Sequence, residues 1–211
     1  MNKNTAALVA KKLLEIKAIR LQPETPFTWA SGWKSPIYCD NRLSLSYPEA
    51  RTIIKKELVN AILDNFPRVE AIAGVATAGI PQGALLADAL ALPFLYVRSK
   101  PKGHGMENMI EGKVTPGQKV VVVEDLVSTG GSSLKAVADL KNAGFEVLGM
   151  VAIFTYGFDV AKRNFEEAGV KLVCLSDYAS MLPQAVEYEY ASEDDLNALE
   201  EWRKNPANWK Q

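Results

Sequence analysis

Cysteine, long apolar runs and an excess of either charge are all scarce in this sequence, and each shortage excludes a class of protein. The two cysteines, Cys39 and Cys174, lie far apart and in no metal-ligand spacing, which excludes a disulfide framework or a zinc site as the basis of the fold. Lys and Arg total 24 against 25 Asp and Glu, so the chain lacks the basic excess that nucleic-acid binding requires. We expect reduced thiols and no nucleic-acid partner.

The apolar runs are also too short for a membrane helix. The first segment, MNKNTAALVAKKLLEIKAI, mixes Lys and Glu into its apolar face, where a signal peptide would be uniformly apolar. We therefore expect a cytoplasmic protein without membrane contact. The rest of the composition, 48% hydrophobic and 23% charged over 211 residues, is that of one globular domain with a well-buried core.

The N-terminal part predicts two helices separated by a short hairpin. Apolar residues at helical spacing predict an amphipathic helix over 5–19, behind an Asn4 or Thr5 cap. The stretch Ser46-Tyr47-Pro48-Glu49 resembles a capping box and predicts a helix that ends near Asn65. Between the two helices, 27–42 predicts two short strands around a turn.

From Val69 onward, short apolar strands alternate with helices. The predicted strands are 69–74, 93–97, 119–124, 146–156 and 171–175, and the predicted helices are 81–92, 132–142 and 159–168. Strands that are apolar on both faces are typical of a parallel sheet covered by helices, so the predicted fold class is α/β. After Ser176 two further helical stretches follow, the second capped by Ser192.

The stretch VVVVEDLVSTGGSS, residues 120–133, carries the main functional signal. A buried strand runs into two carboxylates, Glu124 and Asp125, and small and hydroxyl residues then open a helix. Ligands gather at the carboxyl ends of parallel strands, and a helix N-terminus binds anions. We therefore predict that residues 128–132 hold one phosphate monoester and that the two carboxylates hold the diol of a ribose. The glycine and lysine spacing excludes a P-loop and a dinucleotide fingerprint.

These residues resemble the phosphoribosyl-diphosphate (PRPP) signature of type I phosphoribosyltransferases. The resemblance implies a parallel sheet flanked by helices with a small N-terminal hood. It divides the chain into a first helix and hood (1–45), a core (46–178) and a helical tail packed on the same domain (179–211). The PRPP-binding residues that it implies within the signature are Glu124, Asp125, Leu126, Val127, Ser128, Thr129, Gly130, Gly131 and Ser132.

Two more segments resemble orotate phosphoribosyltransferases in particular. FTWASGWKSPIYCDNR is similar to the segment that covers the pyrimidine, which makes Phe27 and Lys34 candidate orotate ligands. The resemblance also implies that Ser128 of the signature lies where the pyrimidine and the phosphate pocket meet, so Ser128 is a third candidate. VRSKPKGHG resembles the mobile catalytic loop, which adds Arg98, Lys102 and His104 to the PRPP-binding candidates. The loop is cationic, glycine-rich and too polar to pack, as expected of a lid over departing diphosphate.

A third segment, AGVATAGIP at 73–81, stands where the family has its pyrophosphate loop. A turn whose glycines are needed only for close packing is nearly as consistent with these residues.

The resemblance implies a complete reaction. Orotate attacks C1 of PRPP to give orotidine 5′-phosphate and diphosphate, a step of de novo pyrimidine (UMP) biosynthesis. The catalytic candidates are Lys102, His104 and Asp125. Mg²⁺ is the implied cofactor, and it would be held mainly by PRPP and water, so no protein ligand for the metal is predicted. A lid that reaches the neighbouring subunit's site implies a homodimer.

Three positions depart from the family pattern. Ala30 and Ala78 stand where many members have Lys, and Tyr156 stands where many have the Arg that holds the orotate carboxylate. Two alternatives therefore stay open: a purine phosphoribosyltransferase, and a non-catalytic regulator that senses PRPP. A regulator would be expected to add a DNA-reading domain or a basic face.

Overall fold

The computed structural model describes residues 2–29, 31–100 and 109–210, and a six-stranded sheet forms its centre. The strands are β5 (Ala71–Val75), β6 (Phe94–Val97), β7 (Ile110–Glu111), β8 (Lys119–Val127), β9 (Glu146–Thr155) and β10 (Leu172–Asp177). Their order is β10-β9-β8-β5-β6-β7, and all neighbours are parallel except β6 and β7. The predicted α/β class is confirmed, with an antiparallel edge strand that the sequence did not reveal.

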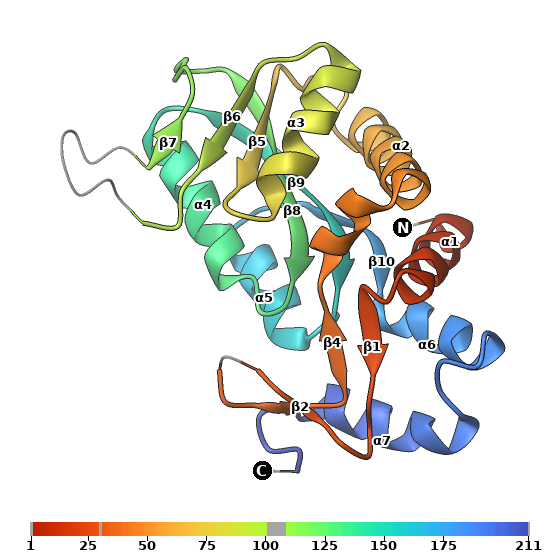
Figure 1. Ribbon diagram of the computed structural model, residues 1–211. Helices are drawn as coiled ribbons and strands as arrows, with labels where there is room; N and C mark the ends of the chain where they lie inside the picture. The colour runs from red at the N-terminus through yellow and green to blue at the C-terminus, as the bar shows by residue number, and fades with distance from the viewer. Residues whose placement is uncertain (1, 30, 101–108, 211) are drawn as a thin grey trace.

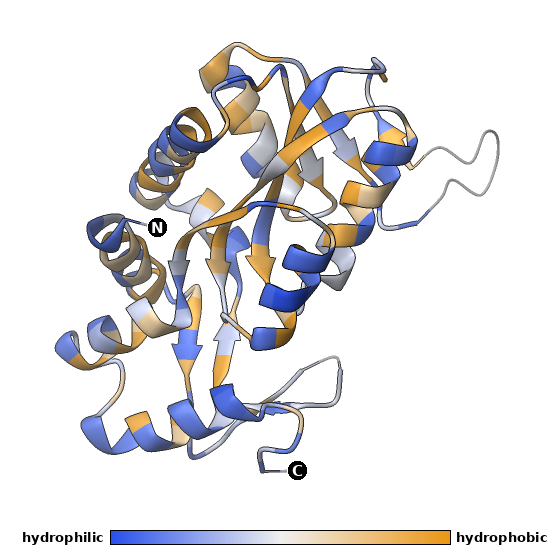
Figure 2. Ribbon diagram, turned by 180° about the vertical axis from the view of Figure 1, so that it is seen from behind, coloured by the Kyte–Doolittle hydropathy of each residue, from blue (hydrophilic) through white to orange (hydrophobic). Residues whose placement is uncertain are grey.

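Helices cover both faces of this sheet (Figure 1). One face packs against α1 (Lys3–Glu15), α2 (Pro48–Asn65) and α3 (Gly79–Leu90), and the other packs against α4 (Gly131–Asn142) and α5 (Asp159–Glu167). Successive residues of a strand point to opposite faces, so Val121 and Val123 enter the first core and Val120 and Val122 the second. Figure 2 shows the apolar strands between helices whose outer faces are largely polar.

A small hood of short strands stands at one end of the sheet. In it, β1 (Ile19–Leu21) pairs with β4 (Ile37–Cys39), and β2 (Phe27–Thr28) pairs with β3 (Lys34–Ser35), both antiparallel. The predicted strand-turn-strand is therefore confirmed as β2 and β3. A 3₁₀ helix, η1 (Asn41–Ser46), then leads into α2.

In the tail, α6 (Tyr178–Glu187) packs on α1 and β10, and α7 (Glu193–Lys204) supports the hood. The Trp202 indole nitrogen donates to the carbonyl oxygen of Lys34 at 3.2 Å, and the Trp202 ring meets Trp29 edge-on at 5.5 Å. The predicted Ser192 cap is confirmed, because Ser192 and Asp195 form a capping box. These contacts fix the hood hairpin on the body of the domain.

The bounds of the first predicted helix and the cap of the second were wrong. The first helix is capped by Asn2 and ends at Glu15, because Lys17 takes a left-handed φ of 58° and Ile19 belongs to β1. The capping box before α2 does not form: Ser46 ends η1, and Tyr47 is the N-cap without a side-chain bond.

Both cysteines are free thiols, as expected. Within the described ranges, no helix has the length and apolar character of a membrane span.

Candidate active site

The acidic pair lies inside β8, and this corrects the predicted strand end. The strand continues past Glu124 and Asp125 to Val127, which pairs with Thr155 of β9. Glu124 is only 6% exposed; its Oε2 accepts from Ser133 Oγ at 3.0 Å and its Oε1 from the Asp125 backbone N–H at 3.1 Å. The role of Ser133 was missed, because a second serine after the glycines looked like an ordinary helix residue.

Burial sets the protonation of this pair. Desolvation, together with the neighbouring Asp125 charge, raises the pKa of Glu124 to about 8. Desolvation also raises the pKa of Asp125, although hydrogen bonds from Glu124 and the backbone, and to a smaller extent the charge of Arg42, oppose that rise. Burial and the neighbouring Asp125 charge therefore favour a protonated Glu124 near neutral pH.

A pocket of about 430 Å³ opens beside the pair. Three segments form it: the hood, the loop between β5 and α3, and β8 with the start of α4. The lining residues are Cys39, Asp40, Arg42, Val75, Ala76, Thr77, Ala78, Glu124, Asp125, Leu126 and Ser132. The structure thus brings together four residues of the predicted signature and adds the hood residues Asp40 and Arg42. The sequence offers one signal that could have identified Asp40 and Arg42 as site residues: an acidic and a basic residue close together at the end of the FTWASGWKSPIYCDNR segment.

The hood is tied directly to the acidic strand. Asn41 Nδ2 donates to the backbone carbonyl oxygen of Asp125 at 2.7 Å, and Ser44 Oγ donates to the carbonyl oxygen of Asn41 at 2.6 Å. Gln82 Nε2 of α3 donates in turn to Ser44 Oγ at 3.3 Å. Buried side chains of η1 and α3 therefore donate hydrogen bonds that join η1 to β8 on one side and to α3 on the other.

The predicted phosphate loop has the geometry that its glycines suggest. Gly130 is the N-cap of α4 with a φ of +84°, and a Cβ there would come within 2.7 Å of the Phe165 ring. Gly131 begins the helix, and a Cβ on it would meet only Thr129 Oγ1, at 4.0 Å. Asn164 Nδ2 of α5 donates to the carbonyl oxygen of Thr129 at 2.9 Å, which anchors the loop to α5. Open space at a helix N-terminus suits an anionic ligand.

The segment at 73–81 forms a tight strand-to-helix turn beside the pocket. A Cβ on Gly79 would collide with the Val123 carbonyl oxygen, and one on Gly74 would lie 2.7 Å from the Gly79 carbonyl oxygen. The Ala76–Thr77 peptide is cis. The glycines therefore have a packing reason, while Val75 to Ala78 still face the pocket.

Several predicted site residues lie away from the pocket. Phe27 packs on Tyr38, and Lys34 Nζ donates to Thr28 Oγ1 at 2.9 Å in the exposed hairpin. Arg98 stands at the end of β6 and its Nη1 bonds Glu111 Oε1 at 3.2 Å. Lys102 and His104, like Ala30, lie outside the described residues.

Tyr156 stands at the carboxyl end of β9, but it is a core residue. It is 3% exposed, and its ring contacts Trp29, Phe158 and Trp202 at centroid distances of 5.0, 5.5 and 5.7 Å. Burial raises the pKa of its hydroxyl well above the ordinary value, so the residue stays neutral. Tyr156 cannot supply the charge that an arginine would bring to this position.

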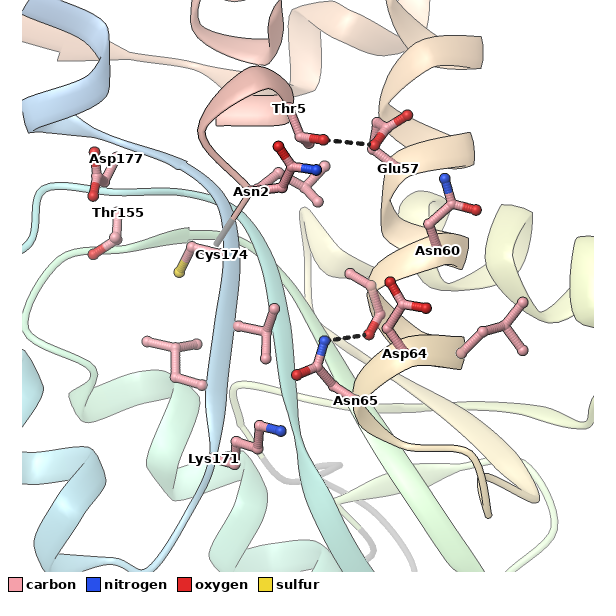
Figure 3. A pocket seen from close by; sticks show the side chains of 15 residues that line it. Asn2, Thr5, Glu57, Asn60, Asp64, Asn65, Thr155, Lys171, Cys174 and Asp177 are labelled. Atoms are coloured by element: carbon pink, nitrogen blue, oxygen red, sulfur yellow. Dashed lines mark hydrogen bonds between the residues drawn. The ribbon is translucent and has the colours of Figure 1, made fainter. Parts of the chain in front are cut away.

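A larger cavity, of about 660 Å³, lies between the start of α1, α2 and β10 (Figure 3). Thr5 Oγ1 bonds Glu57 Oε2 at 2.9 Å at one end of it, and Lys171 stands at the other. None of the predicted site residues lines it, and we assign it no ligand.

Comparison with known proteins shows the family of the chain. Residues 46–190 match the phosphoribosyl transferase domain family. The orotate phosphoribosyltransferase of Cytophaga hutchinsonii is 61% identical over 96% of this chain and 97% of that protein, and that of Porphyromonas gingivalis is 59% identical over 98% and 99%. The crystal structure of orotate phosphoribosyltransferase from Aeropyrum pernix is 29% identical, with a TM-score of 0.75 over 87% of this chain and 99% of that one. The chain therefore belongs to the phosphoribosyl transferase domain family and, within it, to the orotate phosphoribosyltransferases.

Proposed function

We propose that the protein transfers the ribose 5-phosphate of PRPP to orotate, giving orotidine 5′-phosphate and diphosphate. The observation that carries this proposal is the pocket in which Glu124 and Asp125 stand between an open helix N-terminus and the β5–α3 turn. A phosphate, a diol and a diphosphate on one sugar require three such elements around one cavity. The family relationship supplies the acceptor.

In this proposal, residues 128–132 bind the 5-phosphate and the two carboxyls bind the ribose hydroxyls. A ring nitrogen of orotate forms a bond to C1 of the ribose while the bond from C1 to the diphosphate breaks, so the sugar passes through a cationic oxocarbenium state. Asp125, whose carboxyl lines the pocket, would stabilise that positive charge. No covalent nucleophile is needed, and the rate depends on positioning and on charge balance.

We propose that Phe27 and Lys34 act with the hood hairpin to cover the pyrimidine, and that Ser128 lies where base and phosphate meet. Arg98, Lys102 and His104 are proposed to close over the diphosphate as a lid. A homodimer, in which one subunit's lid serves its partner, is proposed on the family resemblance. Two expectations stay predictions. One is the cytoplasmic location, and the other is the division of the chain into 1–45, 46–178 and 179–211.

Mg²⁺ is the proposed cofactor, and the donor chemistry of the pocket fits it. The carboxylates of Asp40, Glu124 and Asp125 are hard oxygen donors of the kind that Mg²⁺ prefers. Among the residues that the structure describes, no three metal-ligating side chains cluster closely enough to hold a metal alone. We therefore propose that PRPP and water hold most of the ion, with the carboxylates outside them. Bound Mg²⁺ would supply charge compensation for the diphosphate.

The acceptor is tested by offering PRPP, Mg²⁺ and one base at a time: orotate, uracil, adenine or hypoxanthine. The loss of each base's own absorbance measures its consumption. We expect orotate to be consumed and neither purine to be consumed. If a purine is consumed and orotate is not, the protein is a purine phosphoribosyltransferase and the proposed function is wrong. Binding of PRPP without turnover of any base would favour a PRPP-sensing regulator.

A further inference from the structure

Arg42 is the single basic side chain among the described residues that line the site pocket. The same lining carries three acidic side chains, Asp40, Glu124 and Asp125. Such a pocket repels a polyanion unless cations balance it. The neighbouring turn from Val75 to Ala78 brings backbone groups and uncharged side chains only. Arg42 is therefore the fixed positive charge that this part of the site can offer.

The guanidinium of Arg42 is held in one orientation by Asp40. Its Nε and Nη2 donate to Asp40 Oδ1 and Oδ2 at 2.6 and 2.9 Å, and the Arg42 backbone N–H donates to Oδ1 at 3.2 Å. Two parallel hydrogen bonds fix the plane of a guanidinium. Hydrogen bonding to Arg42 also lowers the pKa of Asp40, so the pair stays ionised.

The other edge of Arg42 remains available. Its Nη1 makes no hydrogen bond with any residue that the structure describes, and its side chain is 59% exposed, whereas that of Asp40 is 22% exposed. The positive charge reaches the acidic strand, because it opposes the rise in the pKa of Asp125. Asp40 thus anchors the arginine at the rim of the pocket, and Nη1 stays free for an oxyanion.

We propose that Arg42 is a substrate-contacting residue that binds the diphosphate of PRPP through its free edge, while Asp40 orients it. The negative charge on the departing diphosphate grows as its bond to C1 breaks, so a fixed cation at this place stabilises the transition state as well as the bound donor. This inference rests on PRPP being the donor and does not depend on which base accepts the ribose.

The test is equilibrium binding of Mg²⁺-PRPP to Arg42→Gln by titration calorimetry, without any base. Gln retains an amide donor for Asp40 and removes the charge. Loss of one hydrogen bond between charged groups predicts that Kd for PRPP rises about tenfold or more. Ribose 5-phosphate, which lacks the diphosphate, is the second probe, and its Kd should stay within about twofold of the wild-type value.

Arg68→Gln is the control, because Arg68 is an exposed arginine in the loop between α2 and β5, outside the pocket. It should leave both dissociation constants unchanged. Arg42→Lys keeps the charge, and its affinity for PRPP should fall between those of wild type and Arg42→Gln. Melting temperatures of all variants show whether the fold is retained. If Arg42→Gln does not fold, Arg42→Lys carries the test, and a Kd for PRPP equal to the wild-type value in that variant would then overturn the inference.

A Kd for PRPP within twofold of wild type in Arg42→Gln would overturn the inference, and so would an equal loss of affinity for ribose 5-phosphate. If the wild-type protein consumes a purine in place of orotate, the proposed acceptor is wrong while the role of Arg42 stands. If the wild-type protein does not bind PRPP, both are wrong.

Discussion

Asn41 and Asp125, 84 positions apart in the sequence, are joined by a hydrogen bond of 2.7 Å from the Asn41 side chain to the Asp125 backbone carbonyl oxygen. Asn41 is fully buried, so this bond is shielded from water. The hood therefore does more than cover the site, because it holds the acidic strand at the point where the ribose is expected to bind.

Asn41→Ala is expected to lower both stability and turnover. Loss of a buried donor leaves the Asp125 carbonyl without this partner, which costs about 1–3 kcal/mol. Because Asp125 would also lose its positional restraint, kcat should fall while the protein remains folded. Chemical denaturation and orotate-dependent kinetics measure the two effects. Asn65→Ala, which removes a bond only to the Ala61 carbonyl of its own helix, should spare kcat. An unchanged kcat in Asn41→Ala would contradict the positioning role.

The two loop glycines should respond differently to alanine. Gly130→Ala forces a left-handed φ on a residue with a Cβ, at about 1–2 kcal/mol, and drives that Cβ into Phe165, so the melting temperature should fall. Gly131→Ala places its Cβ in open space at the helix start, so stability should hold while KM for PRPP rises. Thermal melts and KM values compare the pair. A normal KM in a stable Gly131→Ala would place the phosphate elsewhere.

Glu124→Gln should change how stability depends on pH. The folded-state pKa of Glu124 is raised to about 8, so the wild-type carboxyl stabilises the fold below about pH 4.5 and loses that contribution as pH rises through about 8. Gln mimics the protonated acid and has no such loss. The melting temperature of Glu124→Gln relative to wild type should therefore increase from pH 5 to pH 8.

This comparison needs the unliganded protein, because PRPP would perturb the pair. Glu146→Gln, at the exposed start of β9, should show no such trend. A constant difference between Glu124→Gln and wild type across this pH range would mean that Glu124 is ionised in the fold.

Tyr156→Arg, which restores the common family residue, should damage this protein. The guanidinium would have to enter the aromatic cluster of Trp29, Phe158 and Trp202, and an unpaired buried charge costs several kcal/mol. A sharp loss of melting temperature is expected. Tyr156→Phe, which keeps the ring, should remain close to wild type in stability. A stable Tyr156→Arg with tighter orotate binding would show that the site reorganises easily.

The sequence predicted the centre of the fold because its signals are local. The valine run before Glu124 reads as a strand buried on both faces, and the structure places alternate valines in two separate cores. β7 was missed because two residues, Ile110 and Glu111, are too few to show a period, and their strand pairing depends on β6. The first helix was predicted too long because nothing local marks the left-handed turn at Lys17.

The site was predictable only in part, for the same reason. The signature residues from Glu124 to Ser132 are contiguous, so their chemistry can be read from the sequence. Asp40 and Arg42 join them through tertiary contacts, and no spacing reveals that. Tyr156 lies in the core because Trp202, from the distant tail, packs against the Tyr156 ring. The sequence around Tyr156 does not reveal this contact.

The central claim is that this protein makes orotidine 5′-phosphate at the site around Asp125. The direct measurement is to incubate the wild-type protein with PRPP, Mg²⁺ and orotate and to quantify orotidine 5′-phosphate and diphosphate by chromatography, alongside Asp125→Asn. We predict equal amounts of both products from wild type and a strongly reduced rate from Asp125→Asn. Release of ribose 5-phosphate with orotate unconsumed, or full activity in Asp125→Asn, would contradict the account.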